Sequence, residues 1–266
     1  MSLVETDIFG VTRDKVQISI DRIKTFEPPE GYYVAFSGGK DSIVILDLVK
    51  RSGVKFDAHY NITGIDPPEL YYFIRDQHPE VQRHRPEMTI WALIVKKMMP
   101  PTRIMRYCCH YLKEQGGKGR IVMTGVRWAE SQRRSLRKMV EQCNQRAGAG
   151  YVNPIIDWAD EDVWQYIKEN NIKYCSLYDE GFKRLGCIGC PMSGKGRLKE
   201  FARWPRVEIL YRKAFAAAVT ARNRRPGEWT EKHPLTVEWN SGEAMFDWWM
   251  EDKHVKKDPD QSVLFE

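Results

Sequence analysis

Long hydrophobic runs are missing from this chain of 266 residues. The longest apolar runs, residues 43–49 and 215–219, are far shorter than the roughly 20 apolar residues that cross a bilayer as a helix. Residues 1–9 contain Glu5 and Asp7 and lack the basic start and apolar stretch of a secretory signal. We therefore expect no transmembrane helix, no membrane partner and a cytoplasmic protein.

Internal repeats and low-complexity tracts are also missing from the sequence. Hydrophobic residues make up 42% of the chain and charged residues 29%, near the averages of globular proteins, so a disordered chain is not expected. The length allows one large α/β domain with an appendage, or two modest domains. The formal net charge of +6 suits an anionic ligand, and both a nucleotide and a nucleic acid qualify.

Apolar periodicity and turn residues divide the chain into alternating helices and strands. Helical patterns cover residues 12–25, 42–51, 160–167 and 198–222, and β-prone segments cover residues 32–36, 56–62 and 120–124. This alternation predicts an α/β fold with a doubly wound, mainly parallel sheet and helices on both faces. A ligand is then expected beyond the carboxyl ends of the strands.

The segment between the strand at 32–36 and the next helix reads Ser37-Gly38-Gly39-Lys40-Asp41-Ser42. We call it the glycine loop. Its glycines let the backbone approach an anion, and a helix starting at Asp41 or Ser42 presents unpaired N–H groups and the positive end of its dipole. Ser37, Lys40 and Ser42 add hydroxyl and ammonium donors. The loop predicts a phosphate or sulfate site, and the alternative is an ordinary capped glycine turn.

The six cysteines are Cys108, Cys109, Cys143, Cys175, Cys187 and Cys190. In a reducing compartment, paired cysteines are more often metal ligands or redox catalysts than structural disulfides. The adjacent pair and the later C-x-x-C turn supply four thiolates, which suit either tetrahedral zinc or a 4Fe-4S cluster. Spacing does not choose between these two, and unliganded thiols are a third reading. Cys143 and Cys175 are interpreted as ordinary small side chains.

The glycine loop resembles the signature of the PP-loop enzymes, also called adenine nucleotide α-hydrolases. Further stretches resemble the phosphoadenylyl-sulfate reductase family of that superfamily. These stretches are residues 61–64 with 68–69, residues 124–127 with 130–131, and residues 153–158. With the loop and the cysteines, the resemblance covers roughly residues 30–195.

The resemblance implies an enzyme that binds ATP or an adenylyl nucleotide such as adenylyl sulfate, with Mg²⁺ accompanying ATP. The implied cofactor-binding residues are the whole glycine loop together with Gly64, Lys113, Gly125 and Arg127. Lys40, Asp41 and Arg127 are the implied catalytic residues. A glycine after a strand allows close approach to a ligand, and Arg127, with Arg133 or Arg134, can pair with phosphate or sulfate oxygens.

The order of a Cys-Cys pair and a later Cys-x-x-Cys is similar to the cluster motif of adenylyl-sulfate reductases and of DNA phosphorothioation sulfurtransferases. This similarity implies a 4Fe-4S cluster on Cys108, Cys109, Cys187 and Cys190, with zinc as the alternative metal. Lys113 stands where the reductases place a lysine beside the cluster.

One feature departs from the reductases. They carry a nucleophilic cysteine in a C-terminal Glu-Cys-Gly-x-His segment, whereas no cysteine follows Cys190, so attack on the sulfate sulfur lacks its thiol. We therefore expect adenylation of an acceptor such as nucleic acid, or sulfur transfer to it, with a sulfur or electron donor protein as partner. The alternatives are thiol-dependent reduction of adenylyl sulfate or phosphoadenylyl sulfate, and a non-catalytic nucleotide or nucleic-acid sensor.

Three segments are expected along the chain. Residues 1–29 form an N-terminal helical segment, residues 30–195 the PP-loop nucleotide-binding and iron-sulfur domain, and residues 196–266 a basic helical C-terminal appendage. Arg and Lys concentrate between residues 197 and 225, which favours a polyanion-binding surface or simply a solvated one. The sequence leaves open whether the chain forms an oligomer.

Overall fold

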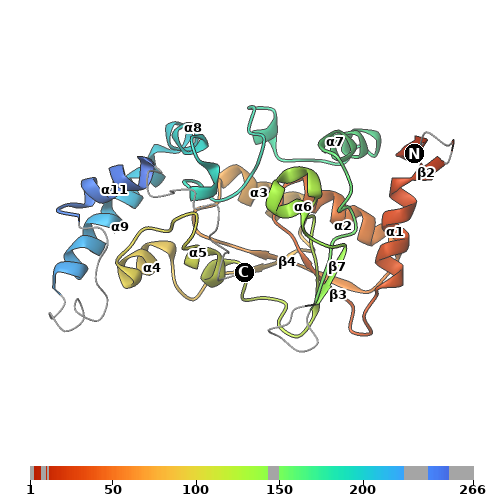
Figure 1. Cartoon of the computed structure of the whole chain (residues 1–266), viewed down its shortest axis with the longest axis horizontal. Coiled ribbons are helices and arrows are strands. Elements are labelled where there is room, and N and C mark those ends of the chain that lie inside the picture. Colours follow the sequence, from red (N-terminus) through yellow and green to blue (C-terminus); the bar gives the residue numbers. More distant parts are fainter. Residues whose placement is uncertain (1–2, 7–9, 11, 143–149, 225–238, 252–266) are drawn as a thin grey trace. The chain divides into compact units, whose positions relative to one another are not determined.

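The computed structural model describes residues 3–6, 10, 12–142, 150–224 and 239–251. The chain divides into two compact units. We call Met1–Pro86 with Leu112–Gly186 the sheet unit, and Glu87–Tyr111 with Cys187–Glu266 the helical unit (Figure 1). No helix of the described residues is long and apolar enough to span a membrane.

The sheet unit is built around a six-stranded sheet with the order β5-β4-β3-β6-β8-β7. Its strands are β3 (Tyr32–Ala35), β4 (Phe56–Asn61), β5 (Gln82–His84), β6 (Ile121–Met123), β7 (Val140–Gln142) and β8 (Gly150–Val152). All neighbouring strands are parallel except β7 and β8. The predicted doubly wound, mainly parallel sheet is therefore confirmed, with one antiparallel edge strand.

Helices pack around this sheet. They are α1 (Lys15–Thr25), α2 (Lys40–Ser52), α3 (Pro68–Gln77), α6 (Gln132–Ser135) and α7 (Asp160–Glu169), with 3-10 turns at Trp128–Glu130 (η1) and Ser176–Tyr178 (η2). α2 lies between α1 and α7 and contacts both (Figure 1). The core joins strand to helix, since Val34, Leu48 and Val49 are fully buried, each contributing roughly 1.5–3 kcal/mol.

A short hairpin, β1 (Val4–Thr6) with β2 (Thr12–Asp14), precedes α1. The Asp14 side chain then accepts hydrogen bonds from the Val16 and Gln17 N–H groups, which is the usual chemistry of a helix N-cap. The sequence pattern predicted the helix over 12–25 but not this hairpin, because its three-residue strands are too short to show alternation.

The order of the strands places the predicted motifs at one edge of the sheet. β3 pairs with β4 on one side and with β6 on the other, so the direction of winding reverses between β3 and β6. Ligands bind at such a reversal, beyond the carboxyl ends of the strands. The glycine loop follows β3, Gly64 follows β4 and Gly125 follows β6.

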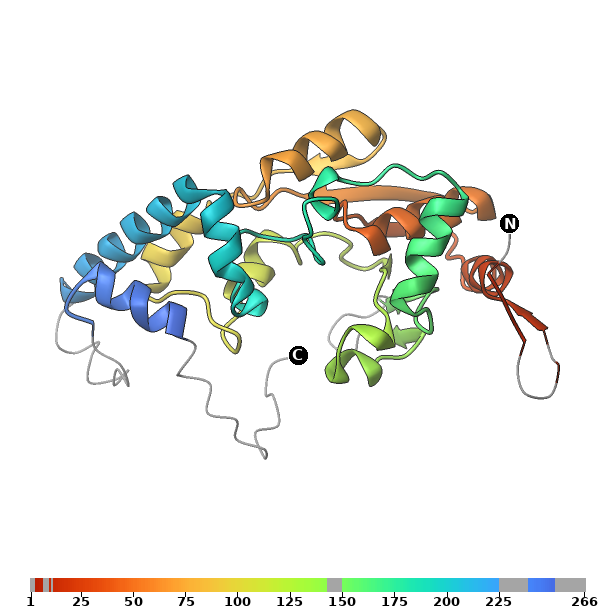
Figure 2. The same ribbon diagram turned by 90° about the horizontal axis from the view of Figure 1, so that it is seen from above.

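The helical unit contains α4 (Ile90–Lys97), α5 (Tyr107–Leu112, whose last residue belongs to the sheet unit), η3 (Pro191–Ser193), α8 (Gly196–Arg203), α9 (Pro205–Asn223) and α11 (Gly242–Glu251). α9 contacts α4, α8 and α11, and Figure 2 shows α11 alongside α9. The core is aromatic, since the ring of Tyr211 lies 4.9 Å from that of Trp249 and 5.9 Å from that of Phe201. Gly242 lets α11 lie close to α9, because a Cβ at Gly242 would lie 2.5 Å from the Ala216 backbone.

The single helix predicted over residues 198–222 is wrong. α8 ends at Arg203 and α9 begins at Pro205, because proline lacks an N–H and forces the preceding residue out of the helical region. Trp204 accordingly has φ −128° and ψ 68°.

The compact units also cut the chain at other positions than the three expected segments. Residues 87–111 group with the C-terminal helices, so both cysteine pairs belong to the helical unit. Of the expected C-terminal appendage, α8, α9 and α11 are described, while residues 225–238 and 252–266 lie outside the described residues.

Candidate nucleotide-binding site and cysteine group

The two glycine positions of the glycine loop differ in backbone conformation and in the space available for a side chain. Gly38 has φ +72°, and a Cβ there would lie 2.8 Å from the Leu70 and Ile74 side chains, so this position requires glycine. Gly39 has φ −76°, which any residue adopts, and a Cβ there would meet nothing closer than 3.5 Å. Helix α2 begins at Lys40, one residue earlier than predicted.

The loop presents a row of backbone donors at the start of α2. The N–H groups of Gly38, Gly39, Asp41 and Ser42 have no hydrogen-bond partner among the described residues. The hydroxyl of Ser42 accepts from the Ser37 N–H at 3.2 Å and donates to the Gly39 carbonyl at 2.9 Å, which fixes the bend of the loop. Unpaired amides at the positive end of a helix form an anion-binding site.

Lys40 and Asp41 belong to a network of four charged side chains. The Lys40 ammonium lies 2.9 Å from Asp160 Oδ1 and 3.4 Å from Asp41 Oδ2. Arg127 joins the same carboxylates, through Nε to Asp41 Oδ1 at 2.7 Å and Nη2 to Asp160 Oδ1 at 2.8 Å. Burial opposes the charge of Asp160, but Lys40 and Arg127 outweigh it and lower the pKa of that carboxyl.

Arg127 is 1% exposed, and its third nitrogen, Nη1, donates to the Trp158 carbonyl at 3.2 Å. Every guanidinium nitrogen therefore bonds within the protein. This arrangement suits a residue that holds Asp41 and Asp160 in place, whereas the expected direct contact with phosphate or sulfate stays a prediction.

The other predicted residues have different surroundings. A Cβ on Gly125 would lie 3.0 Å from the Asp41 backbone, so glycine is needed there for packing of the loop. Gly64 has φ +78° and open space around it. The Lys113 carbonyl accepts from the Asn61 side chain at 3.0 Å, and Arg134 pairs with Glu130.

Two residues of this site were missed by sequence reasoning. Asp160 opens the acidic start of the helix predicted over residues 160–167, and acidic residues at a helix start are expected from the helix dipole alone. Tyr178 had no signal in the sequence, because the bond between its hydroxyl and the Lys40 N–H, at 2.8 Å, joins positions 138 residues apart.

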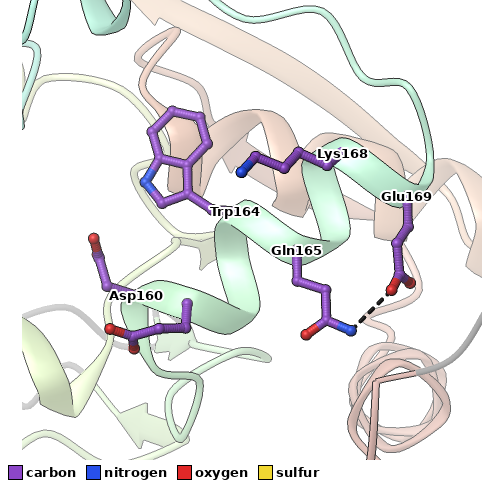
Figure 3. Close-up of a pocket in the computed structure, with 6 residues that line it drawn as sticks. Asp160, Trp164, Gln165, Lys168 and Glu169 are labelled. Carbon is purple, nitrogen blue, oxygen red and sulfur yellow. Dashed lines mark hydrogen bonds between the residues drawn. The ribbon is translucent and has the colours of Figure 1, made fainter.

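A pocket of about 560 Å³ lies along α7 and is lined by Asp160, Glu161, Trp164, Gln165, Lys168 and Glu169 (Figure 3). All six residues come from one helix, so the pocket is an open surface and not the enclosed cleft typical of ligand sites. Asp160 is the residue that it shares with the charged network of the glycine loop. The pocket is therefore a weaker candidate for a ligand site than the glycine loop.

In the helical unit, α5 carries Cys108 and Cys109, while Cys187 and Cys190 flank a tight turn closed by the bond from the Cys190 N–H to the Cys187 carbonyl, 3.2 Å. Gly189 within the turn has φ +73°, and a Cβ there would lie 2.8 Å from the Phe201 and Tyr211 rings. Its N–H donates to Glu200 Oε2 at 2.7 Å. The turn is thus fixed against the aromatic core.

The four thiols of these two segments form one group. The hydrogen bond with Cys109, burial, and the charges of Cys109, Cys187 and Cys190 raise the pKa of the Cys108 thiol far above its usual range. The Arg106 guanidinium approaches Cys109 Sγ at 3.4 Å. Among the described cysteines no disulfide is formed; Cys175 is buried in the sheet unit, and Cys143 lies outside the described residues.

The expected basic surface of residues 197–225 needs correction at two positions. Arg197 is 1% exposed and donates to the Trp249 carbonyl at 2.9 Å, so it completes the end of α11 and does not face a polyanion. Arg212 pairs with Glu208 and Glu243. Within residues 197–225, exposed basic residues remain at Lys199, Arg203, Arg206, Lys213 and Arg224, and the exposed Lys195 lies just before this range.

Several known proteins are similar to this chain. The adenosine 5'-phosphosulfate reductase of Staphylococcus epidermidis is 28% identical over 200 residues, which are 70% of this chain and 80% of that protein. The enzyme of the same name from Oceanobacillus iheyensis is 28% identical over 172 residues, 59% of this chain and 69% of that protein. An uncharacterized protein of Methanocaldococcus jannaschii is 28% identical over 228 residues, and the chain spans only 43% of its length.

Among solved structures, the phosphoadenylyl-sulfate reductase of Candida auris, a phosphate complex, matches with a TM-score of 0.50 and 20% identity over 64% of this chain and 87% of that chain. At this identity the likeness shows the fold alone. The model of the phosphoadenosine phosphosulfate reductase domain matches residues 31–193, which is more than half of the chain and includes the glycine loop and both cysteine pairs. The chain belongs to this phosphoadenosine phosphosulfate reductase family of the PP-loop superfamily.

Proposed function

We propose that this chain binds an adenine nucleotide at the glycine loop and uses it to activate an acceptor, by adenylation or with sulfur transfer. The observation that carries the proposal is the row of N–H groups at Gly38, Gly39, Asp41 and Ser42, which have no partner among the described residues, beside the Lys40 ammonium. Such a row at a helix start is complementary to phosphate or sulfate oxygens. Family membership supports adenine as the base.

The charged network supplies what transfer of an adenylyl group needs. When a nucleophile of the acceptor attacks the α-phosphorus of ATP, negative charge grows on the leaving pyrophosphate. Lys40 and the free amides are fixed donors for that charge and need no reorganisation during the reaction. Arg127 holds Asp41 and Asp160 in place, and Mg²⁺ is proposed to accompany ATP.

The cysteine group supports a 4Fe-4S cluster on Cys108, Cys109, Cys187 and Cys190. Among the described residues, no group of three or more His, Cys, Asp or Glu side chains is arranged to hold a metal ion. The cluster is proposed because the helical unit contains both cysteine pairs and their order along the chain is similar to the cluster motif; four thiolates also suit tetrahedral zinc, which is the alternative metal. The cluster would supply electron transfer or structural support.

The acceptor is proposed to be a nucleic acid, because exposed Lys195, Lys199, Arg203, Arg206 and Lys213 lie on or beside α8 and α9. A protein that donates sulfur or electrons would be the further partner. A second candidate is reduction of adenylyl sulfate or its 3'-phosphorylated form, which is favoured by the similarity to two adenosine 5'-phosphosulfate reductases. Its thiol would come from a partner protein, since no cysteine follows Cys190.

One experiment separates these functions. Protein purified without oxygen is analysed for iron and sulfide, and then assayed for pyrophosphate release from ATP beside sulfite release from adenylyl sulfate. Pyrophosphate release stimulated by oligonucleotide supports adenylation of a nucleic acid. Sulfite release with a thiol donor supports the reductase, and binding of nucleotide without either product leaves only a sensor.

A further inference from the structure

We propose that Tyr178 is a further nucleotide-binding residue, whose hydroxyl donates a hydrogen bond to the anionic end of a nucleotide bound at the glycine loop. The inference rests on the proposed nucleotide site and names a residue of it that lies far from every motif in the sequence.

The hydroxyl of Tyr178 stands within the row of backbone donors. It accepts from the Lys40 N–H at 2.8 Å, while the neighbouring N–H groups on either side, at Gly39 and Asp41, have no partner among the described residues. A Cβ on Gly39 would lie 3.5 Å from both the Tyr178 hydroxyl and the Ser37 hydroxyl. The two hydroxyls therefore border the same opening above Gly39.

The proton of this hydroxyl is still available. A hydroxyl that accepts one hydrogen bond retains its own O–H donor, and no described residue accepts a hydrogen bond from the Tyr178 hydroxyl. Burial, together with the charges of Asp41, Cys175 and Asp160, raises the pKa of Tyr178 despite the opposing bond from Lys40. The hydroxyl is thus a neutral donor at physiological pH. Because the Lys40 N–H is used in the bond to this hydroxyl, the O–H of Tyr178 is the donor offered to a ligand at this position, and it reaches further into the opening.

Tyr178 is held in this position by the helix that also holds the Lys40 side chain. Its ring packs edge-on against Trp164 of α7, with ring centres 5.0 Å apart. The first residue of α7, Asp160, accepts from the Lys40 ammonium at 2.9 Å. α7 thus fixes Lys40 at its backbone through Tyr178 and at its side chain through Asp160, which is the preorganisation that a binding site needs.

The test is calorimetry of ATP and adenosine with the wild-type chain, Tyr178→Phe and Tyr174→Phe. Phenylalanine keeps the ring against Trp164, and its edge still covers the Lys40 N–H, so that amide cannot replace the lost donor. We expect Tyr178→Phe to bind ATP about tenfold to a hundredfold more weakly and to bind adenosine like the wild type. Tyr174→Phe, whose hydroxyl bonds Asp179 at 3.0 Å, is the matched control and should bind both ligands unchanged.

The adenosine titration shows whether each variant is folded, because a disrupted site would lose adenosine and ATP together. Unchanged or tighter ATP binding by Tyr178→Phe, with weaker binding by Lys40→Met, would overturn the role of Tyr178 and leave the proposed site standing. Loss of both ligands in Tyr178→Phe would show a structural role and overturn the inference as well. A wild-type chain that binds neither ATP nor adenylyl sulfate would overturn the proposed function itself.

Discussion

In the sheet unit, most donors of the proposed nucleotide site come from six consecutive residues, and distant side chains such as Arg127 and Asp160 serve to hold them. In the helical unit, the thiols come from two segments far apart in the sequence, and neither segment presents four ligands alone. The first site is largely formed by local backbone geometry, whereas the second depends on the packing of α4 and α9. Sites of the first kind tolerate loss of a supporting side chain better than sites of the second kind tolerate loss of a ligand.

This difference predicts that replacing a single cysteine of the group removes all of the bound iron. Cys187→Ser should abolish bound iron in anaerobically purified protein, because a serine oxygen is a poor ligand for iron in place of thiolate. Iron and sulfide analysis with the visible absorption spectrum measures the effect. Cys175→Ala is the control, since Cys175 lies buried in the sheet unit, and it should keep the iron. Stoichiometric zinc without iron in the wild type would contradict the cluster.

The charged network of the sheet unit gives the next largest effect. Arg127→Met leaves Asp41 and Asp160 with the Lys40 ammonium as their remaining shared partner, and removing one side of a buried ion pair costs about 3–5 kcal/mol. Because the Asp160 side chain is 56% exposed, we expect the lower end, about 3 kcal/mol, in denaturant unfolding. Arg134→Met breaks the surface pair with Glu130 and should cost less than about 1 kcal/mol. Equal costs for the two variants would contradict the structural role of Arg127.

The two glycines of the loop test whether local backbone geometry forms the loop. Gly38→Ala places a methyl group against Leu70 and Ile74 at a positive φ, and we expect it to lower the free energy of unfolding by about 2 kcal/mol. Gly39→Ala has room and an ordinary φ, so its stability should stay within about 0.5 kcal/mol of wild type. Thermal unfolding of the two variants measures the contrast, and equal destabilisation would show that the loop is shaped otherwise.

The smallest effect concerns pH. Burial lowers the pKa of His59 and of His78, and neither ring nitrogen of His78 has a hydrogen-bond partner among the described residues. The unfolded chain takes up these protons near pH 6.5, before the folded chain does. Stability is therefore complete above about pH 6.5 and falls as the pH is lowered below it. His78→Leu should flatten that fall in unfolding curves recorded between about pH 7 and about pH 5; an unchanged slope would assign it to other groups.

The sequence predicted those parts of the fold that depend on neighbouring residues. β3, the glycine loop and α2 form one continuous segment, so turn residues and apolar periodicity were sufficient. The end of α8 before Pro205 could have been predicted from the lack of an N–H in proline. The apolar pattern continues on both sides of Pro205, however, and it indicated one continuous helix. The hairpin before α1 is too short for any pattern.

The sites show the same limit. The six loop residues follow from local chemistry, whereas the burial of Arg127 requires knowing that Asp160 of α7 reaches the loop. The contact of Tyr178 with Lys40 arises only when the segment after α7 folds back over the start of α2. Likewise, Arg197 belongs to a basic run in the sequence, yet the carbonyl of Trp249 draws it into the core. Packing between segments far apart in the sequence determines the surroundings of these residues, and the pattern of a single sequence does not predict such contacts.

The central claim is that the glycine loop binds the anionic end of an adenine nucleotide. Calorimetry with ATP, adenylyl sulfate and GTP on the wild-type chain and on Lys40→Met tests it most directly, because methionine keeps the buried stem of Lys40 and removes only its charge. We expect the wild-type chain to bind ATP or adenylyl sulfate in preference to GTP. We expect Lys40→Met to bind the preferred nucleotide about tenfold to a hundredfold more weakly. Equal binding of GTP, or undiminished affinity in the variant, would contradict the central claim.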